Sequence, residues 1–301
     1  LAVFLTGGTG FIGRHIARRL VERGHRVHAL VRNPRAALVL RDLGAELVEG
    51  DITRPSTLSG AIDGCDSVIH LVGIIRERPP AVSFKSVHVA GTEHVLDEAV
   101  RAGVRKFVHM SALGARSGGT PYHTTKSEAE DAVRSSGIHH VILRPSIVVG
   151  PGSEFIKILH RVLRLLPATP VIGDGQYRLQ PVDVEDVASA FTLAAERDDL
   201  EDESFDIAGP HKLTYNRVLG IMCEELGIRR LRVHVPLSLV RPGVNVIERL
   251  GLPAPINSDE LAMLLDENVV GDDGNALQRV FGLEPTPFRA VLQRIKESAG
   301  R

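Results

Sequence analysis

The sequence predicts an α/β protein with a doubly wound parallel sheet and a smaller, mostly helical C-terminal lobe. Short β-branched runs alternate with helical patterns from residue 1 to about residue 144, and a glycine-rich loop joins the first strand to the first helix. After Pro145 the spacing changes, because prolines and glycines interrupt the chain more often. Strands that alternate with helices need crossover connections, which are typical of parallel sheets.

The first half of the chain carries the expected sheet. We expect strands at 2–6, 26–31, 46–49, 67–71, 106–110 and 141–143, where apolar runs suit strands covered on both faces. Helices are expected at 11–23, 81–102 and 122–136, where apolar residues recur every three or four positions.

The second half predicts a lobe that interrupts the sheet. Helices are expected at 155–165, 184–195 and 214–226, the last with Thr214 as its N-cap, and a strand at 204–208 returns to the sheet. We therefore expect a dinucleotide-binding domain at 1–146, with 176–210 returning to it. Residues 147–175 and 211–301 would form the smaller substrate lobe.

Composition excludes several classes of protein. The 301 residues include 36 basic and 37 acidic side chains, so no overall charge draws the chain to nucleic acid. Cys65 and Cys223 form no metal or redox motif and suit a reducing compartment. We expect no export leader, because the sequence opens on a strand pattern, and we expect no membrane span, because no apolar stretch approaches the roughly 20 residues required. We expect a cytoplasmic protein, with membrane association at most peripheral.

The loop after the first strand predicts a phosphate-binding turn. It reads Thr-Gly-Gly-Thr-Gly-Phe-Ile-Gly, at the junction of a strand and a helix. Gly7 permits the tight turn, Gly10 lets the backbone approach a pyrophosphate, and Gly13 lets the helix pack on the strand. Amide groups and the positive helix end attract phosphate. The residues expected to bind a nicotinamide dinucleotide here are Gly7, Thr9, Gly10, Phe11, Ile12 and Gly13. The alternative is a purely structural turn.

The end of the second strand favours NADP(H) over NAD(H). An acidic residue that accepts from the adenosine ribose is typical there, but the chain reads Val-Arg-Asn-Pro-Arg. A guanidinium pairs with a 2′-phosphate instead. Arg32 is the first candidate for this contact and Arg35 the second, whereas in the alternative interpretation Arg32 is only a solvated surface residue.

Two later strand ends extend the predicted cofactor site. Asp51 follows the third strand, where its carboxylate could accept from the adenine amino group while Ile52 packs on the ring. Leu71, Val72 and Gly73 close the fourth strand, and Gly73 would let the chain pass close to the cofactor. Either segment alone could be an ordinary loop.

Tyr122 and Lys126 predict acid–base chemistry. They lie four residues apart at the start of a helix, so their side chains share one face. An ammonium nearby favours phenolate and so lowers the pKa of a tyrosine toward the physiological range. Lys126 could also hold the nicotinamide ribose, while the alternative is a helix-opening tyrosine beside a solvated lysine.

Together these motifs resemble the extended and atypical short-chain dehydrogenase/reductase superfamily over nearly the whole chain. Segments 143–146 and 180–187 look like its NAD-dependent epimerase/dehydratase branch, and segments 109–115 and 259–270 look like bacterial relatives of the NADPH-carrying accessory subunit of respiratory complex I. The resemblance implies that Tyr122 is the proton donor or acceptor, that Lys126 binds the ribose and supports Tyr122, and that Pro145 belongs to the cofactor site.

One position departs from the family pattern. Members usually carry two small polar residues after the fifth strand, the second of them catalytic, whereas this chain reads Ser111-Ala112. Without a gap, Ala112 occupies the catalytic position and Ser111 lies one residue early. Ser111 is kept as a catalytic candidate.

Other types of site find little support. The 13 histidines form no metal-ligand spacing, and the chain has neither a Gly-x-Ser-x-Gly nor a P-loop signature. Asp183, Glu185 and Asp186 suit a helix start, where acidic residues complement the dipole. Arg161, Arg164 and Arg178 could meet an anionic substrate or could simply be solvated.

Two hypotheses of different classes remain. The leading one is an NAD(P)-dependent oxidoreductase or epimerase-like enzyme that favours NADP(H), acts on a small molecule and moves a proton with Tyr122. Its rival is a non-catalytic NADPH-binding structural or assembly subunit, associated with a respiratory NADH:quinone oxidoreductase or another partner. Either protein could form a homodimer.

Overall fold

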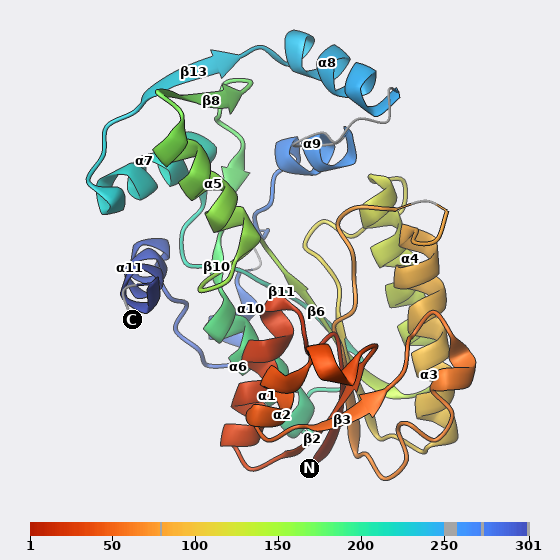
Figure 1. The fold of residues 1–301 in the computed structure, drawn as a ribbon. Coiled ribbons are helices and arrows are strands. Elements are labelled where there is room, and N and C mark those ends of the chain that lie inside the picture. The colour runs from red at the N-terminus through yellow and green to blue at the C-terminus, as the bar shows by residue number, and fades with distance from the viewer. Residues whose placement is uncertain (79, 250–257, 272–273, 300–301) are drawn as a thin grey trace. The chain divides into compact units, whose positions relative to one another are not determined.

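The computed structural model describes residues 1–78, 80–249, 258–271 and 274–299 and divides the chain into two compact units (Figure 1). Unit 1 comprises Leu1–Pro145, Val184–Ile207 and Asn275–Glu284, and unit 2 comprises Ser146–Asp183, Ala208–Gly274 and Pro285–Arg301. This division differs from the sequence prediction at 146, 176–183 and 208–210, which lie in unit 2, and at 275–284, which lie in unit 1. Residues 275–284 pack against the sheet of unit 1 through a contact between the Phe205 and Phe281 rings, 5.7 Å apart.

Unit 1 is built on a seven-stranded parallel sheet in the order β11-β6-β5-β4-β1-β2-β3. The strands are β1 (Ala2–Thr6), β2 (Arg26–Val31), β3 (Glu46–Glu49), β4 (Ser67–His70), β5 (Lys106–Met110), β6 (His139–Pro145) and β11 (Glu203–Ile207). The predicted doubly wound parallel sheet is confirmed. All residues of β1 and β4 are buried, because helices cover both faces of the sheet.

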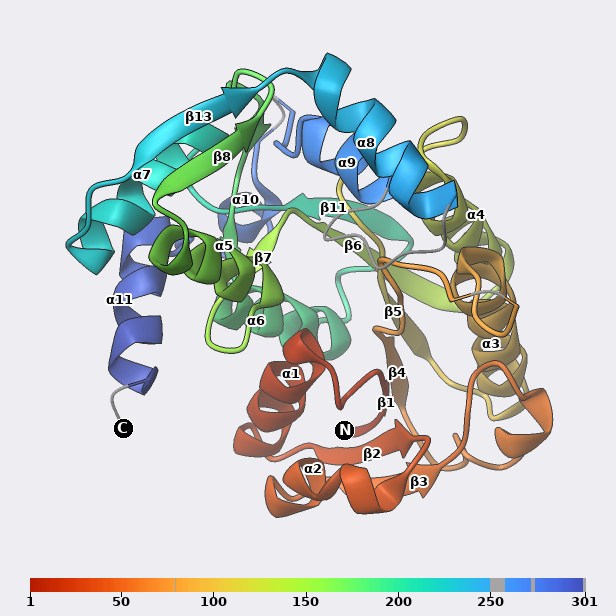
Figure 2. The same ribbon diagram turned by 45° about the horizontal axis from the view of Figure 1, so that its top comes forward.

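Helices lie on the two faces of the sheet in unit 1 (Figure 2). One face carries α1 (Phe11–Glu22), α2 (Leu38–Asp42) and α6 (Val184–Glu196), and the other carries α3 (Gly91–Arg101) and α4 (Pro121–Ser135). Shorter elements are the 3₁₀ turns η1 (Pro34–Ala36) and η2 (Pro55–Thr57), the π-helical turn η3 (Lys85–Ala90) and α10 (Ala276–Arg279). The predicted single helix at 81–102 is therefore a π-helical turn that continues into α3, a difference that apolar spacing over six residues cannot reveal.

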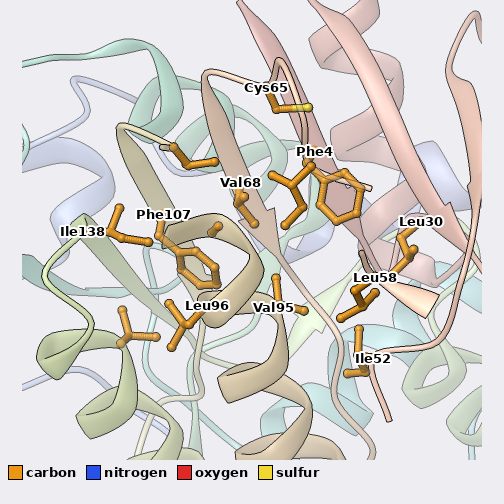
Figure 3. Packing of buried hydrophobic residues seen from close by; sticks show 14 of the residues in the cluster. Phe4, Leu30, Ile52, Leu58, Cys65, Val68, Val95, Leu96, Phe107 and Ile138 are labelled. Carbon is orange, nitrogen blue, oxygen red and sulfur yellow. The ribbon is translucent and has the colours of Figure 1, made fainter. Parts of the chain in front are cut away.

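A buried apolar cluster fills the space between the sheet and helix α3 (Figure 3). Phe4 and Phe107 come from two strands of the sheet and are fully buried, and they belong to the same cluster as Val95 and Leu96 of α3. Burial of large side chains of this kind stabilises a fold by about 1.5–3 kcal/mol each. The cluster therefore holds α3 on the sheet whose strand ends carry the predicted site.

Unit 2 is smaller and more helical. Its helices are α5 (Glu154–Leu165), α7 (Tyr215–Leu226), α8 (Leu237–Arg249), α9 (Ser258–Leu265) and α11 (Phe288–Ala299). Its strands form three two-stranded sheets: β10 (Val182–Asp183) with β7 (Val148–Val149), β12 (Leu213–Thr214) with β9 (Arg178–Leu179), and β13 (Leu231–Val235) with β8 (Ala168–Ile172). A separate apolar core joins α5, α7 and α11. In the part of the chain that the structure describes, no helix is long and apolar enough to cross a bilayer.

Strand order in unit 1 creates a switch point between β1 and β4. From β1 the chain continues into α1 on one face, and from β4 it continues into η3 and α3 on the other. The two connections still touch, because a Cβ added at Gly7 would lie 3.2 Å from both Leu71 and Val72. Ligands of doubly wound sheets bind at such a point, outside the carboxyl ends of the strands.

We predict that Gly13→Ala lowers the free energy of unfolding by about 3 kcal/mol or prevents folding. An alanine Cβ would lie 2.2 Å from the Gly7 carbonyl oxygen and 2.7 Å from the Gly8 Cα, and backbone atoms cannot move aside as a side chain can. Urea unfolding followed by circular dichroism measures the effect. The matched control is Gly271→Ala, where no atom lies within 4 Å of the added carbon. Equal stability of the two variants would contradict the prediction.

Candidate functional site

The glycine loop holds a narrow backbone turn that only glycine fits. Gly7 has a left-handed backbone conformation with φ of 74°, and its carbonyl accepts from the Gly10 amide at 3.0 Å. The first turn of α1 then passes so close to this carbonyl that Gly13 has no room for a side chain. The loop therefore brings the amino end of α1 directly against the end of β1.

The amino end of α1 is prepared for an anion. Its N-cap is Gly10, which makes no side-chain capping bond, and no acidic residue lies in the first turn. Amide groups there keep their positive partial charge. Thr9 is exposed, and its carbonyl accepts from Arg14 Nε at 2.9 Å. These features fit the pyrophosphate of a dinucleotide.

The two arginines predicted to bind the 2′-phosphate of NADP(H) are exposed, after the strand next to the one that leads into the glycine loop. Arg32 directly follows β2, the neighbour of β1 in the sheet. Arg35 lies in η1, and its amide donates to Asn33 Oδ1 at 3.0 Å. Neither guanidinium pairs with a carboxylate of the described residues, so both are available to a phosphate.

Asp51 and Ile52 follow β3 but face different surroundings. Asp51 Oδ1 accepts from both the amide and the hydroxyl of Thr53, at 2.9 and 2.8 Å. Ile52 is only 4% exposed and packs in the core against Gly91 of α3. The contact of Ile52 with an adenine ring stays a prediction. Most of the Ile52 side chain is buried in the core, so little of its surface could contact a ligand.

The segment after β4 passes close to the predicted catalytic lysine. Leu71 is buried, and its amide donates to the Thr6 carbonyl at 3.3 Å, which continues the pairing of β4 with β1. A Cβ at Gly73 would lie 3.6 Å from His88 Nε2 and 3.7 Å from Lys126 Nζ. Gly73 thus lies at the switch point next to the ammonium group.

Lys126 is a buried cation on α4. Thr120 caps this helix by accepting from the His123 amide at 3.2 Å, and Pro121 occupies the first turn. Lys126 is 2% exposed, and its Nζ donates to the Met110 carbonyl at 2.6 Å, at the end of β5. Burial lowers the pKa of Lys126 to about 8, while Glu130 opposes that shift.

Tyr122 lies one turn before Lys126, within a group of rings. Its ring meets Phe84 and His88 edge to face, with centroids 5.9 and 5.5 Å apart. Burial raises the pKa of Tyr122 to about 12, and no effect of the ammonium offsets this shift. The expected lowering of the phenol pKa by Lys126 is not found in this arrangement, in which burial raises that pKa and Lys126 Nζ donates to the Met110 carbonyl.

His88 is a residue of the site that sequence reasoning missed. It lies in the π-helical turn η3, with Nε2 3.0 Å from the Ile74 amide and Nδ1 3.0 Å from Thr125 Oγ1. Burial lowers the pKa of His88 to about 3, so the ring is neutral and can accept from the amide. His88 thereby joins the chain after β4 to the first turns of α4.

Two more neutral histidines lie behind the site. Thr6, His70 and His109 occupy paired positions on neighbouring strands, so their side chains share one face of the sheet. His70 Nδ1 lies 2.8 Å from Thr6 Oγ1, whereas neither ring nitrogen of His109 has a hydrogen-bond partner among the described residues. Burial holds the pKa of both rings far below the usual range.

Ser111 lies beside a buried ion pair. Its amide donates to the Leu143 carbonyl at 2.9 Å, and its buried hydroxyl helps to lower the pKa of Glu130 without forming a hydrogen bond of ordinary geometry. Glu130 is 1% exposed and accepts from Arg144 Nε and Arg134, both at 2.7 Å. The bond from Arg144 fastens α4 to β6, which ends at the buried Pro145.

Other acidic groups have structural partners. Glu185 at the start of α6 accepts from Arg18 at 2.5 Å and lies 2.7 Å from His15 Nδ1, which joins α6 to α1. Burial raises the pKa of Glu185, but its bonds to His15 and Arg18 have the larger combined effect and lower the pKa to about 2. Within the described ranges, no group of three or more His, Cys, Asp or Glu side chains could hold a metal.

The hollow with a volume of about 460 Å³ in unit 1 lies at the opposite edge of the sheet. Its lining includes Ser67, Lys106 and His139, which are the first residues of β4, β5 and β6. Cofactors of doubly wound sheets bind at carboxyl ends instead. This hollow is therefore not the predicted site.

Comparison with known proteins supports the dinucleotide-binding interpretation. The family model described as "NAD dependent epimerase/dehydratase family" matches residues 3–208. That range includes the glycine loop, Tyr122, Lys126 and, except for Ala2 of β1, the seven strands of the sheet in unit 1.

Of three relatives with known names, two are named as enzymes and one as a subunit of a respiratory complex. The chain is 35% identical over 188 residues to a ceramide reductase of Caulobacter vibrioides, a match that spans 62% of this chain and 58% of that protein. It is 28% identical to a 4-hydroxy-2-methyl-3-oxo-4-farnesyl-3,4-dihydroquinoline-1-oxide ketoreductase of Stigmatella aurantiaca, over 83% of this chain and 80% of the relative. It is 27% identical to the mitochondrial NADH-ubiquinone oxidoreductase 40 kDa subunit of Neurospora crassa, over 93% and 74%.

A solved structure has the same fold. UDP-glucose 4-epimerase of Thermotoga maritima superposes with a TM-score of 0.77 at 22% identity, and the match covers 100% of both chains. At this identity the likeness concerns the fold alone. The predicted likeness to short-chain dehydrogenases and to an accessory subunit of complex I is confirmed by these matches.

We predict that Lys126→Met stabilises the protein by about 1–2 kcal/mol at pH 7. Below pH 8 the native chain holds a buried ammonium, whereas the unfolded chain solvates it with a pKa of 10.5. Loss of the bond to the Met110 carbonyl offsets part of the gain.

The advantage of Lys126→Met should shrink as the pH rises from about 8 to 10.5, because the wild-type lysine then loses its proton in both states. Urea unfolding at a series of pH values measures it, with the exposed Lys85→Met as a neutral control. A variant that is less stable than wild type at every pH would contradict the assignment of a costly buried charge.

Proposed function

Because this chain belongs to the NAD dependent epimerase/dehydratase family, we propose that it is an NADP(H)-dependent oxidoreductase that interconverts a carbonyl group and an alcohol. The observation that carries the proposal is the juxtaposition of Tyr122, Lys126 and Gly73 with the glycine loop at the switch point of the sheet. A bound nicotinamide supplies or accepts the hydride. The chain's own residues bind that cofactor and move the proton.

The glycine loop is proposed to hold the pyrophosphate and Arg32 the 2′-phosphate. The uncapped amino end of α1 offers amides to an anion, and Gly13 keeps the helix close enough to offer them. Arg32 follows the strand next to the loop and is exposed, so it can reach a phosphate on the adenosine ribose. Arg35 is the weaker candidate, because it lies one turn farther along the chain.

Tyr122 is proposed to give its proton to the carbonyl oxygen of the substrate. A phenol with a pKa of about 12 remains protonated at neutral pH, so it stores the proton that reduction requires. Its hydroxyl makes no hydrogen bond to the described residues, which leaves it available to a substrate. His88 is proposed to position this tyrosine through Thr125.

Lys126 is proposed to bind the nicotinamide ribose and to stabilise the phenolate left after proton transfer. Its ammonium lies beside Gly73, where the cofactor chain would pass. Movement of Nζ from the Met110 carbonyl toward a ribose hydroxyl would exchange one hydrogen bond for another. The same charge would then lower the phenol pKa, the direction that the sequence predicted.

The names of the enzymatic relatives favour a large apolar substrate. One is a ceramide reductase and another a ketoreductase of a farnesyl-bearing dihydroquinoline oxide, so both names join a reducible group to an apolar chain. We propose the same substrate class here, with unit 2 as the part that selects it. We also propose a cytoplasmic location, since Cys65 and Cys223 are both free thiols.

A non-catalytic NADPH-binding subunit is the second candidate. Ala112 occupies the position where the family pattern carries a hydroxyl, and the Ser111 side chain lies by Glu130. The 40 kDa relative is named as a subunit of NADH-ubiquinone oxidoreductase. This candidate keeps the cofactor site and gives up the proton transfer.

We predict that Tyr122→Phe lowers kcat by about 10²–10⁴-fold on a panel of apolar ketones, because the proton donor is lost. NADPH affinity, measured by fluorescence titration, should change little. Tyr177→Phe is the matched control, since the Tyr177 hydroxyl has no hydrogen-bond partner in the described part of the chain. Full turnover by Tyr122→Phe would refute the assigned role, and a wild type that binds NADPH but turns over nothing would favour the non-catalytic candidate.

We predict that Arg32→Ala weakens NADPH binding by about tenfold or more and leaves NADH binding unchanged, because only NADPH carries the 2′-phosphate. Arg35→Ala should have a smaller effect. Calorimetric titration of both cofactors against the three proteins measures this. If the wild type binds NADH more tightly than NADPH, the NADP(H) assignment is wrong.

A further inference from the structure

Unit 2 carries a surface on which exposed apolar and basic side chains gather. Eleven large apolar side chains are exposed among the residues described, and six of them belong to 158–173 and 228–241. These six are Ile158, Leu165, Leu166, Leu231, Val233 and Leu239. Leu165, Leu231 and Leu239 are each about 70% exposed, at 73%, 72% and 68%. We call the surface of these two segments the basic apolar face.

Strand pairing places part of this face on one side of a small ribbon. In the parallel pair β8–β13, Leu231 lies opposite Ala168 and Val233 opposite Pro170. Paired residues point to the same side, so these four apolar residues share one surface of the ribbon. The other side of β8 is buried through Thr169 and Val171 in unit 2. The ribbon thus presents an apolar side outward, as the exposure of Leu231, Val233 and Pro170 shows.

Helix α5 continues the same character on its exposed side. With about 100° per residue, Arg164, Arg161, Leu165 and Ile158 lie within roughly a third of the helix circumference. All four are exposed, whereas the opposite side of α5 packs into the core of unit 2. Basic and apolar side chains therefore lie next to each other along one line of the helix, which leads directly into β8 (Figure 2).

The charge of the basic apolar face has one sign. Segments 158–173 and 228–241 contain six arginines and no Asp or Glu, in a chain whose net charge is -1. The arginines are Arg161, Arg164, Arg229, Arg230, Arg232 and Arg241. Arg230 Nε donates to the Leu163 carbonyl at 2.8 Å and so ties the two segments together.

Two of the acidic groups near this face have partners of their own, whereas a third, Asp174, directly follows segment 158–173. Glu224, which lines the same hollow as Arg229 and Arg232, pairs with Arg217 at 2.9 Å and also with Arg289. Glu154, at the start of α5, lies 3.5 Å from Lys157. The six arginines therefore outnumber the acidic groups beside the face, and its net charge stays positive.

We propose that the basic apolar face docks unit 2 on an anionic lipid surface, with leucine and valine side chains entering the boundary of the acyl chains and arginines contacting phosphate headgroups. Projecting leucines beside arginines are the composition that binds membrane interfaces, where apolar burial and headgroup attraction add. In water, by contrast, six large apolar side chains stay exposed to solvent, which is unfavourable. The attachment is peripheral and is independent of the reaction proposed above.

Two other occupants fit this face less well. Nucleic acid would use the arginines but would leave the leucines of α5 and β13 without apolar contact. An acidic protein could cover both, yet the face has no acidic group and no charged pattern that would specify one partner. A fluid lipid surface needs no such pattern, because headgroups rearrange around the arginines.

Vesicle flotation tests the proposal with the full chain. Vesicles of phosphatidylcholine alone and of phosphatidylcholine mixed with phosphatidylglycerol are compared at low and high salt. Wild type should float with the anionic vesicles at low salt and much less with neutral vesicles or at high salt.

Two double variants separate the contributions. Arg161→Gln with Arg164→Gln should lower the partition onto anionic vesicles by about 25-fold, since each arginine near an anionic surface contributes about fivefold. Leu165→Ser with Leu231→Ser should lower it by about tenfold at either salt concentration, because all six arginines remain and the salt dependence of binding is kept. The matched controls lie in unit 1: Arg41→Gln with Arg54→Gln, and Leu38→Ser with Val39→Ser, all exposed positions. Thermal unfolding confirms that every variant folds.

Three outcomes would overturn the proposal. The first is equal flotation with neutral and anionic vesicles, and the second is an equal loss in the unit 1 controls. The third is that the leucine variant keeps full binding while heparin or polyglutamate competes as well as lipid, which would make the face a simple polyanion site. Flotation with the anionic vesicles, lost in both variants and kept in both controls, supports it.

Discussion

The contact between the start of α1 and the end of β1 is the constraint on which the dinucleotide site depends. Gly13 lies so close to the Gly7 carbonyl that the helix begins directly above the strand end. This approach aims the uncapped amides of α1 at the switch point, where the chain after β4 also passes. Arg32, Asp51 and Gly73 then follow successive strand ends at the same edge of the sheet. Because all strands of a parallel sheet end at the same edge, residues that are far apart in sequence lie close together there.

A group of buried polar side chains on and around α4 is the second feature of unit 1 on which the site depends. Lys126 keeps an ammonium in a nearly dry environment, while His70, His88 and His109 are held neutral around it. A buried cation and neutral rings are compatible, because the rings accept hydrogen bonds without adding charge. One turn after Lys126, Glu130 accepts from Arg134 of the same helix and from Arg144 of β6, and the bond to Arg144 fastens α4 to the sheet. The proposed proton donor thus lies on a helix that is bonded to the sheet through Lys126 and Glu130.

Much of the fold and part of the site could be predicted from the sequence. The six strands expected before Pro145 are present within a few residues, because apolar runs and crossover helices are local patterns. The glycine loop and the four-residue spacing of Tyr122 and Lys126 were equally local. His88 and the Glu130–Arg144 pair were not found, since the residues they bind are distant in sequence and no short motif contains both partners. The basic apolar face was missed for the same reason, although Arg161 and Arg164 had been noted.

By itself, the sequence determined which positions need glycine and which side chains follow each strand. Both depend on neighbouring residues, through backbone conformation and strand periodicity. Only the tertiary structure decided the chemistry of those side chains. Whether Lys126 lowers the pKa of Tyr122 depends on the position of Nζ, which here donates to the Met110 carbonyl, while burial raises the pKa of Tyr122. Whether Ile52 can meet a ligand depends on α3, which takes its side chain into the core. Burial and partner choice arise from packing between distant segments, and these set charge states that no local pattern encodes.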